Sequence, residues 1–105
     1  MQRGEVWWSD QPPPVGRRPV VLISRDRALQ VRANVTVVQV TTTIRHIASE
    51  VPLGSDDGLP RDCVANCDVI QTIPKHTLKE KVSLLSEKKR LALDAALRFS
   101  LDLTP

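Results

Sequence analysis

A single helical pattern closes a chain that otherwise reads as short strand-like runs, and this order limits the folds open to it. The strand-like runs cover residues 5–8, 19–24, 34–41, 62–73 and 81–84, with a shorter edge strand around 50–53. After Ser86, the expected N-cap, an apolar stripe recurs at helical spacing through Leu93, Ala96, Leu97, Ser100 and Leu101. Short strands need closure or a cover that hides their edges. The sequence therefore predicts a mainly β, α+β fold: a small, strongly curved, barrel-like sheet with one C-terminal helix.

The length of 105 residues suits one core and is too short for two ordinary domains, so a single domain over residues 1–105 is expected. Apolar residues make up 41% of the chain, but no apolar stretch approaches the ~20 residues that span a bilayer. The first residues enter strand-like sequence directly, without an apolar signal segment. A cytoplasmic location with no membrane partner is therefore expected.

Cys63 and Cys67 are expected to be buried, reduced thiols rather than metal ligands. A zinc site needs further ligands at matching spacings, and His46 and His76 do not supply them. Alternation along 62–73 places four small or apolar side chains on one face: Cys63, Ala65, Cys67 and Val69. The other, outward face carries Asp62, Val64, Asn66 and Asp68. No metal and no other cofactor is expected.

The run Gly16-Arg17-Arg18-Pro19 places two guanidinium groups at the head of an apolar strand. Pro19 has a fixed φ and biases the residue before it toward extended geometry, so Arg18 leaves a stiff stretch of backbone. A guanidinium is planar, permanently charged and bidentate toward phosphate oxygens. The pair suits a phosphate group, and the alternative is two solvated arginines beside a strand-starting proline.

Basic residues cluster in the first half of the chain. Between residues 17 and 45, six arginines stand against one aspartate, Asp26, which gives this segment a charge of +5 within a net charge of +3. The arginines are Arg17, Arg18, Arg25, Arg27, Arg32 and Arg45. Such a cluster is the electrostatic pattern expected of a protein that binds a polyanion such as nucleic acid. The alternative interpretation is that these arginines form an ordinary solvated surface.

A polar stripe ends the strand 34–41. Gln39, Thr41 and Thr43 share one parity, and the neighbouring valines take the other. Threonine is a good strand former, so local structure is one explanation of the stripe. An arginine across the sheet would favour a site instead, and Arg18 is the candidate.

The motifs of several hydrolase classes are absent: the sequence has no nucleophile elbow, glycine-rich phosphate loop or histidine–glutamate metal motif. RNA, however, carries its own nucleophile in the 2′-hydroxyl beside each phosphate. An enzyme can cleave RNA by aligning that hydroxyl and stabilising the charged phosphorane, and an arginine with a hydroxyl side chain could do both. His46, Asp68 and Asp26 are the candidates for a general base.

Six segments occur in a recognisable order: 3–7 (RGEVW), 16–23 (GRRPVVLI), 38–41 (VQVT), 58–68 (GLPRDCVANCD), 72–73 (TI) and 93–97 (LDAAL). Together they resemble the MazF/PemK family of toxin endoribonucleases of type II toxin–antitoxin systems. The resemblance implies a homodimer of SH3-like barrels that cuts single-stranded RNA at short sequences without a metal ion, leaving a cyclic phosphate and a free 5′-hydroxyl. Cleavage of messenger, transfer or ribosomal RNA would inhibit translation and growth. It also implies an acidic antitoxin of the MazE type, whose tail occupies the RNA groove.

Carried over by position, the catalytic arginine of the family falls on Arg18 and its catalytic threonine on Thr41. Arg18 would stabilise the phosphorane and assist the leaving oxygen, and Thr41 would orient the phosphate or the 2′-hydroxyl. The residues expected to hold the RNA strand are Arg17, Arg25, Gln39, Thr42, Asn66 and Asp68.

The chain departs from the family pattern in two places. Asp68 matches an aspartate that contributes to the site in some relatives, but Asn66 replaces the basic residue that precedes it there. The first connection, 11–17, is short and proline-rich, without the acidic residue that many relatives carry in it. Substrate selection is expected to differ accordingly. With two tryptophans and one phenylalanine as the only aromatics, it should depend on hydrogen bonds more than on stacking.

Two other functions fit parts of the sequence. The CcdB family resembles this one in fold and blocks DNA gyrase through its C-terminal helix, but its tail contains a tryptophan and residues 100–105 here do not. A non-catalytic nucleic-acid-binding barrel would need only the arginine cluster. Salt-sensitive binding of RNA without cleavage would select this last function.

Overall fold

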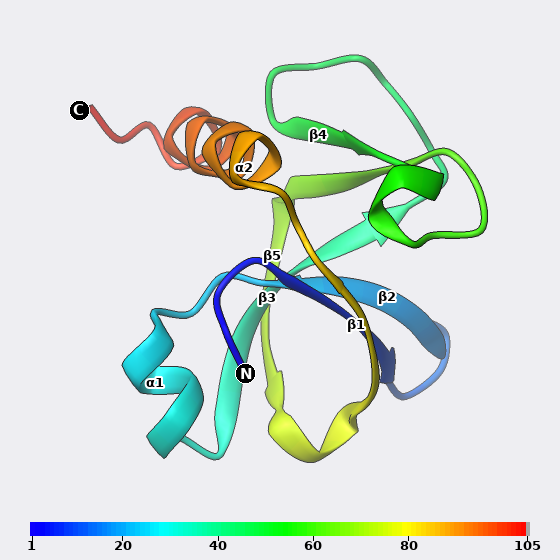
Figure 1. Cartoon of the computed structure of the whole chain (residues 1–105), viewed down its shortest axis with the longest axis vertical. Helices are drawn as coiled ribbons and strands as arrows, with labels where there is room; N and C mark the ends of the chain where they lie inside the picture. Colours follow the sequence, from blue (N-terminus) through cyan, green and yellow to red (C-terminus); the bar gives the residue numbers. More distant parts are fainter. Residues whose placement is uncertain (105) are drawn as a thin grey trace.

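Six antiparallel strands curl into one sheet in the computed structural model, which describes residues 1–104 (Figure 1). The strands lie in the order β4-β5-β3-β2-β1-β6. Their bounds are β1 Glu5–Asp10, β2 Arg17–Leu22, β3 Asn34–Thr41, β4 Glu50–Leu53, β5 Cys63–Pro74 and β6 Leu78–Leu84. The described chain also holds the helices α1 Asp26–Val31 and α2 Glu87–Ser100 and the 3-10 turns η1 Ser55–Asp57 and η2 Lys75–Thr77. The predicted mainly β fold with a C-terminal helix is confirmed, and no helix within residues 1–104 is long and apolar enough to cross a membrane.

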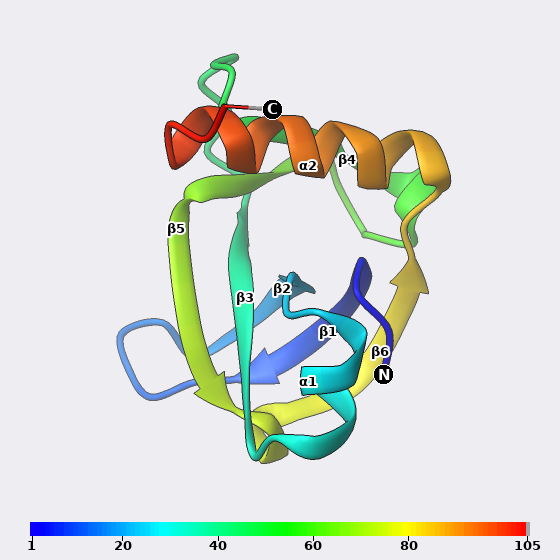
Figure 2. The ribbon, with the colours of Figure 1, turned by 90° about the vertical axis from the view of Figure 1, so that its left-hand side faces the viewer.

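Hydrophobic clusters pack on both faces of the sheet. On β3, Val38 and Val40 belong to the cluster that includes Leu93 of α2. Val35 and Val37, of the opposite parity, pack in a second cluster with the buried face of α1. Figure 2 shows α2 lying across one end of β3 and β5, with α1 beside the other end of β3. Burial on both faces explains why 34–41 is β-branched along most of its length.

Helix α2 begins as the sequence predicts and ends one residue earlier. The Ser86 hydroxyl accepts a hydrogen bond from the backbone N–H of Lys89 at 3.2 Å, which makes it the N-cap. The helix then packs against β4 and β5. Leu101, expected on the buried stripe, is 51% exposed because the helix stops at Ser100 and the stripe has no further turn to follow.

The hairpin of β1 and β2 is longer than the sequence predicts. β1 continues to Asp10 and β2 begins at Arg17, because these residues pair across the hairpin and Ser9 pairs with Arg18. β2 then ends two residues before the predicted end. The strand expected at 81–84 begins earlier, at Leu78, because it pairs along the other side of β1 as far as Ser9. The head of β2 is therefore held inside a paired hairpin.

A break in register divides β5. Val38 of β3 pairs with Ile70, but the next residue, Gln39, pairs with Asn66, so residues 67–69 lie outside the ladder. Alternation does not continue across this break. Val69, expected on the core face, is instead 42% exposed.

The first part of β5 follows the predicted pattern with one exception. Cys63, Ala65 and Cys67 are buried, and both cysteines are free thiols. Burial raises the pKa of the Cys67 thiol to about 11. Val64, expected on the outward face, is only 1% exposed, because paired residues of β3 and β4 flank it on both sides.

Candidate active site

Two pockets adjoin where β2 begins and β3 ends, and Arg18 and Thr41 line both of them. The tryptophan pocket, of about 320 Å³, is lined by Trp8, Arg17, Arg18, Pro19, Val40, Thr41, Thr42, Leu59, Pro60, Arg61 and Cys63. The amide pocket, of about 360 Å³, is lined by Val15, Arg18, Gln39, Thr41, Thr43, Arg45, Asn66, Val69 and Gln71. The arginine and the threonine that the sequence singles out therefore lie between two hollows, each large enough for a nucleobase.

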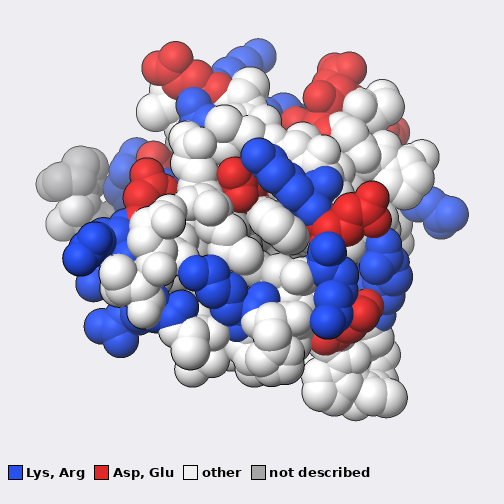
Figure 3. Space-filling model, turned by 60° about the horizontal axis from the view of Figure 1, so that its bottom comes forward, with Lys and Arg blue, Asp and Glu red and all other residues white. Residues whose placement is uncertain are grey.

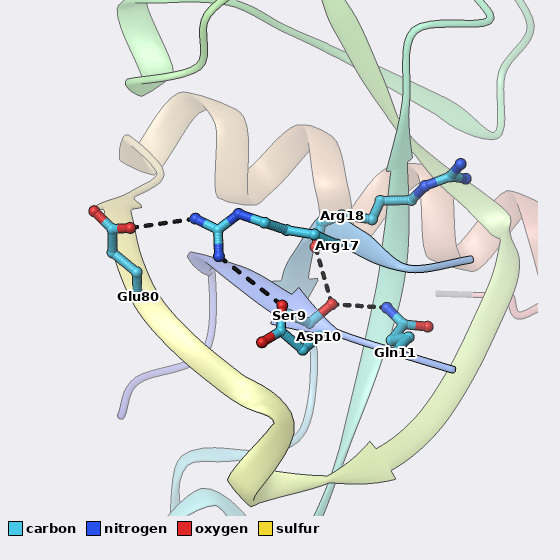
Figure 4. A network of polar contacts seen from close by, with 6 residues as sticks. All are labelled: Ser9, Asp10, Gln11, Arg17, Arg18 and Glu80. Carbon is cyan, nitrogen blue, oxygen red and sulfur yellow. Dashed lines mark hydrogen bonds and ion pairs between the residues drawn. The ribbon is translucent and has the colours of Figure 1, made fainter. Parts of the chain in front are cut away.

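Arg17 and Arg18 point to opposite sides of β2, as alternation along a strand requires (Figure 4). The guanidinium of Arg17 lies 3.3 Å from Glu80 and 4.0 Å from Asp10, and 4.8 Å from the ring centre of Trp8. Within residues 1–104, the side chain of Arg18 forms no ion pair. Arg18 thus offers its whole charge to an incoming anion, whereas two carboxylates offset part of the charge of Arg17.

The backbone of Arg18 is fixed from both sides. The buried Ser9 hydroxyl donates to the carbonyl oxygen of Arg18 at 2.9 Å. Pro19, the next residue, fixes its own φ and lies opposite Trp8 in the ladder of β1 and β2. The guanidinium therefore extends from a rigid anchor, and only its own side-chain torsions remain to be ordered by a ligand.

Thr41 ends β3, and its side chain is oriented locally. Its hydroxyl oxygen accepts a hydrogen bond from the backbone N–H of Thr43 at 3.2 Å, which leaves the O–H to donate toward a ligand. The buried carboxylate of Glu50 accepts from the backbone N–H groups of Arg45 and His46, each at 3.0 Å. These bonds tie down the loop 42–49, from which Arg45 reaches the amide pocket.

A chain of hydrogen bonds links the backbone of Arg18 to the amide pocket. The Ser9 hydroxyl, which donates to Arg18, accepts from the Nε2 of Gln11 at 2.7 Å (Figure 4). The Nε2 of Gln39 donates to the Oε1 of Gln11 at 3.1 Å and also to the Oε1 of Gln71. Ser9, Gln11 and Gln39 are all buried. The first residue of the predicted polar stripe is therefore part of a buried network.

Six of the eight residues predicted for the site line one or both pockets: Arg18, Thr41, Arg17, Thr42, Gln39 and Asn66. Arg25 is not among them. It lies next to α1 and lines a separate pocket with Thr36 and Thr72. Asp68 lines neither the tryptophan pocket nor the amide pocket.

Asp68 is held by two serine hydroxyls. Ser49 donates to one carboxylate oxygen at 2.6 Å and Ser100 to the other at 2.9 Å. These hydrogen bonds stabilise the charged form and lower the pKa of Asp68, which makes it a weaker base. Asp26 and His46, the other candidate bases, are also absent from the linings of both pockets, as far as the described residues go.

Among the other lining residues, four carry a charged, amide or aromatic side chain that the sequence did not single out for the site: Trp8, Arg45, Arg61 and Gln71. Two of them carried a usable signal, since Arg45 belongs to the arginine cluster and Arg61 lies within the segment 58–68. Trp8 reaches its pocket because β1 lies directly beside β2. The position of Gln71 depends on the register break in β5, which no local pattern shows.

Charge is unevenly spread over the surface. On the face shown in Figure 3, Lys and Arg side chains are most frequent in the lower half, whereas most acidic side chains lie in the upper half and a few lie among the basic ones toward the lower right. Residues 1–104 contain no group of three or more His, Cys, Asp or Glu side chains placed to hold a metal ion. The chemistry offered by the two pockets therefore comes from guanidinium, hydroxyl, amide and apolar groups.

The fold and the site together define a small, curved β protein with two adjoining pockets lined in part by arginines. The chain belongs to the PemK-like, MazF-like toxins of type II toxin–antitoxin systems, whose family model matches residues 2–101. The sequence-based assignment to this family is thereby confirmed.

Relatives of known name resemble the chain over almost its whole length. The probable endoribonuclease MazF5 of Mycobacterium tuberculosis is 39% identical over 102 residues, which are 95% of this chain and 92% of that protein. The structure of the M. tuberculosis toxin MazF-mt6 superposes with a TM-score of 0.89 at 32% identity, over 96% of this chain and 99% of that one. A mycobacterial endoribonuclease solved with its cognate antitoxin matches with a TM-score of 0.88 at 28% identity, over 100% and 98% of the two chains.

Proposed function

We propose that this protein is a MazF-type endoribonuclease that cleaves single-stranded RNA at a short sequence by attack of the 2′-hydroxyl, without a metal ion. The observation that carries the proposal is the position of Arg18 and Thr41 between two pockets. A phosphodiester bound there would place one flanking nucleotide in each pocket. Single-stranded RNA fits this arrangement, because its unstacked bases can be splayed into separate pockets.

The chemistry follows from the groups at the shared wall of the pockets. The 2′-oxygen attacks phosphorus and loses its proton, the bond to the 5′-oxygen breaks, and that oxygen takes up a proton. The products are a cyclic phosphate and a free 5′-hydroxyl. Arg18 donates two parallel N–H bonds to the phosphate oxygens and stabilises the charge of the phosphorane. Thr41 donates its O–H to the phosphate or to the 2′-oxygen and so fixes the line of attack.

The remaining predicted residues would hold the strand on either side. Arg17 and Thr42 contribute to the tryptophan pocket, where Trp8 offers an aromatic surface to a base. Gln39 and Asn66 contribute to the amide pocket. The other two predicted residues act elsewhere: Arg25 would contact the RNA backbone beyond the pockets, and Asp68 would act through the serines that it holds.

We further propose that the protein is a cytoplasmic homodimer neutralised by an acidic antitoxin of the MazE type. One structural relative is described as an endoribonuclease in complex with its cognate antitoxin, and another as a MazE-MazF complex from Deinococcus radiodurans. The basic part of the surface in Figure 3 suits an acidic chain as well as RNA, since both are polyanions. Release from the antitoxin would then allow RNA cleavage, which inhibits translation and growth.

One experiment tests the enzymatic proposal. The purified protein is incubated with a mixed RNA pool in the presence of a chelator, and the new 5′ ends are mapped and tested for a free hydroxyl. We expect cuts at a shared short motif and none with the Arg18→Ala variant. RNA binding that weakens with salt but gives no cuts would instead identify a non-catalytic binding protein.

A further inference from the structure

The amide pocket presents mainly hydrogen-bond donors. The Oδ1 of Asn66 accepts from the backbone N–H of Asp68 at 3.0 Å, so its Nδ2 group is left for a ligand. The Oε1 of Gln71 accepts from Gln39, which likewise leaves the Nε2 group of Gln71. Arg18 and a second arginine add guanidinium donors to the same lining. A ligand group in this pocket therefore meets N–H groups from several sides.

The orientation of the Gln71 amide is determined by a series of hydrogen bonds that begins at the backbone carbonyl of Arg18. The Ser9 hydroxyl donates its only proton to the Arg18 carbonyl. Its oxygen can then only accept, so Gln11 must direct its amino group toward Ser9. The Oε1 of Gln11 must then accept, and Gln39 supplies the donor. The same amino group of Gln39 meets the Oε1 of Gln71, which turns the Gln71 amino group away from it. Reversing any amide along this chain would bring like groups together.

The network leaves one atom unsatisfied. Of the buried side-chain nitrogen and oxygen atoms in residues 1–104, the Oε1 of Gln39 is the one without a hydrogen-bond partner. An unpaired buried acceptor is destabilising, and an apolar side chain at this position would avoid it. Packing alone therefore does not explain Gln39, whereas orienting Gln71 does.

We propose that the amide pocket selects, at one position beside the cleaved phosphate, a base that carries a carbonyl oxygen. Gln71 and Asn66 donate to that base, and Gln39 is the positioning residue that keeps the Gln71 amino group facing it. Guanine, cytosine and uracil each have a carbonyl oxygen. Adenine has none: its acceptors are ring nitrogens, and its exocyclic amino group would meet the donors of the pocket where the other bases present a carbonyl, so adenine is disfavoured there. The inference rests on the proposed RNA cleavage and specifies how that activity chooses its sequence.

The first test measures base preference. Oligonucleotides that differ only in the base 5′ or 3′ of the mapped cut are cleaved in the presence of a chelator, and kcat/KM is compared for A, C, G and U. At one of the two positions, adenine is expected to lower kcat/KM about tenfold or more relative to the best other base. Equal cleavage of adenine substrates at both positions would overturn the proposal.

The second test reverses the donor without changing its shape. In Gln71→Glu, one carboxylate oxygen still accepts from Gln39, but the group that faces the base becomes an acceptor. The ratio of adenine cleavage to cleavage of the best other base is expected to rise about tenfold at that position only. Using a ratio within one variant removes the general effect of added negative charge on RNA binding. Gln2→Glu adds the same charge at an exposed residue outside both pockets and should leave the ratio unchanged.

The third test addresses positioning. Glu in place of Gln39 has no N–H to donate, so Gln71 turns its amino group inward and its oxygen toward the base. Gln39→Glu is therefore expected to raise the adenine ratio in the same direction as Gln71→Glu, whereas a merely structural role would lower cleavage of all four substrates equally. Circular dichroism establishes whether each variant folds. If Gln39→Glu does not fold, Gln71→Glu still tests the selection of the base, because Gln71 is partly exposed and tolerates the substitution more easily.

The three tests bear on different parts of the proposal, so their outcomes can be told apart. An unchanged ratio in Gln71→Glu would overturn the selection of a carbonyl-bearing base while RNA cleavage itself stands. A shifted ratio in Gln71→Glu with none in a folded Gln39→Glu would overturn the positioning role of Gln39. Failure of the unsubstituted protein to cut any RNA would overturn the proposed function and this inference with it.

Discussion

Ser9 joins the backbone of Arg18 to the amide network, so its removal probes both. The side chain is fully buried, donates to the Arg18 carbonyl at 2.9 Å and accepts from Gln11 at 2.7 Å. Ser9→Ala removes both hydrogen bonds and adds no volume. It leaves the amide of Gln11 and the carbonyl of Arg18 without these partners.

The expected loss of stability follows from the burial of the two groups. Each buried polar group left unpaired costs about 1–3 kcal/mol. The Gln11 amide is buried and bears most of that cost, whereas Arg18 is partly exposed and its carbonyl lies toward the lower end. The free energy of unfolding should therefore fall by about 2–4 kcal/mol. For a domain of this size, this corresponds to a decrease in Tm of roughly 10–20 °C.

Urea unfolding followed by circular dichroism measures this difference. Both proteins are compared at one concentration, because association would make stability depend on it. Ser55→Ala is the matched control, since Ser55 is exposed and its hydroxyl makes no hydrogen bond within residues 1–104. The control should change the free energy of unfolding by less than about 0.5 kcal/mol. A loss in Ser9→Ala no larger than in the control would show that the two buried hydrogen bonds of Ser9 do not stabilise the fold.

The remaining predictions concern titrating groups away from the pockets. In an NMR titration, the Asp68 carboxyl should show a lowered pKa that returns toward the usual aspartate range in the Ser49→Ala and Ser100→Ala variants. Because the folded pKa is lowered, the stabilisation by Asp68 is present above its unfolded pKa and is lost as pH falls through the folded pKa. An acid dependence of Tm that is the same in the wild type and in both serine variants would contradict this. The Cys67 thiol, with a pKa of about 11, should react with a thiol reagent far more slowly in the native protein than in urea, and equal rates would contradict its burial.

The elements that local pattern determines could be predicted from the sequence. The strand 34–41 is β-branched on both parities because both faces are buried, and α2 has a capping serine and a periodic apolar stripe. The sequence also predicts that Arg18 and Thr41 lie close together, because each lies at the end of a strand and the family order aligns those ends. Both residues line both pockets.

The rest of the site depends on contacts between distant residues. Arg17 pairs with Glu80, which lies 63 residues away in the sequence. The two residues meet because β6 lies beside β1 in the sheet, and neither sequence segment shows this. Asp68 lies outside both pockets, where it accepts hydrogen bonds from Ser49 and Ser100, which belong to other parts of the chain. Gln71 reaches the amide pocket only because β5 breaks register, which alternation along one strand cannot reveal.

Cleavage rates distinguish the roles of the two neighbouring arginines, Arg17 and Arg18. Single-turnover cleavage of one mapped RNA site is measured at saturating protein, with a chelator present, for the wild type, Arg18→Lys and Arg17→Lys. Lysine keeps the charge but not the bidentate donor, so Arg18→Lys is expected to slow cleavage about 100-fold or more. Arg17→Lys, whose parent side chain already pairs with two carboxylates, should change the rate less than about tenfold. A wild-type rate in Arg18→Lys, or an equal loss in both variants, would contradict the assignment of phosphate stabilisation to Arg18.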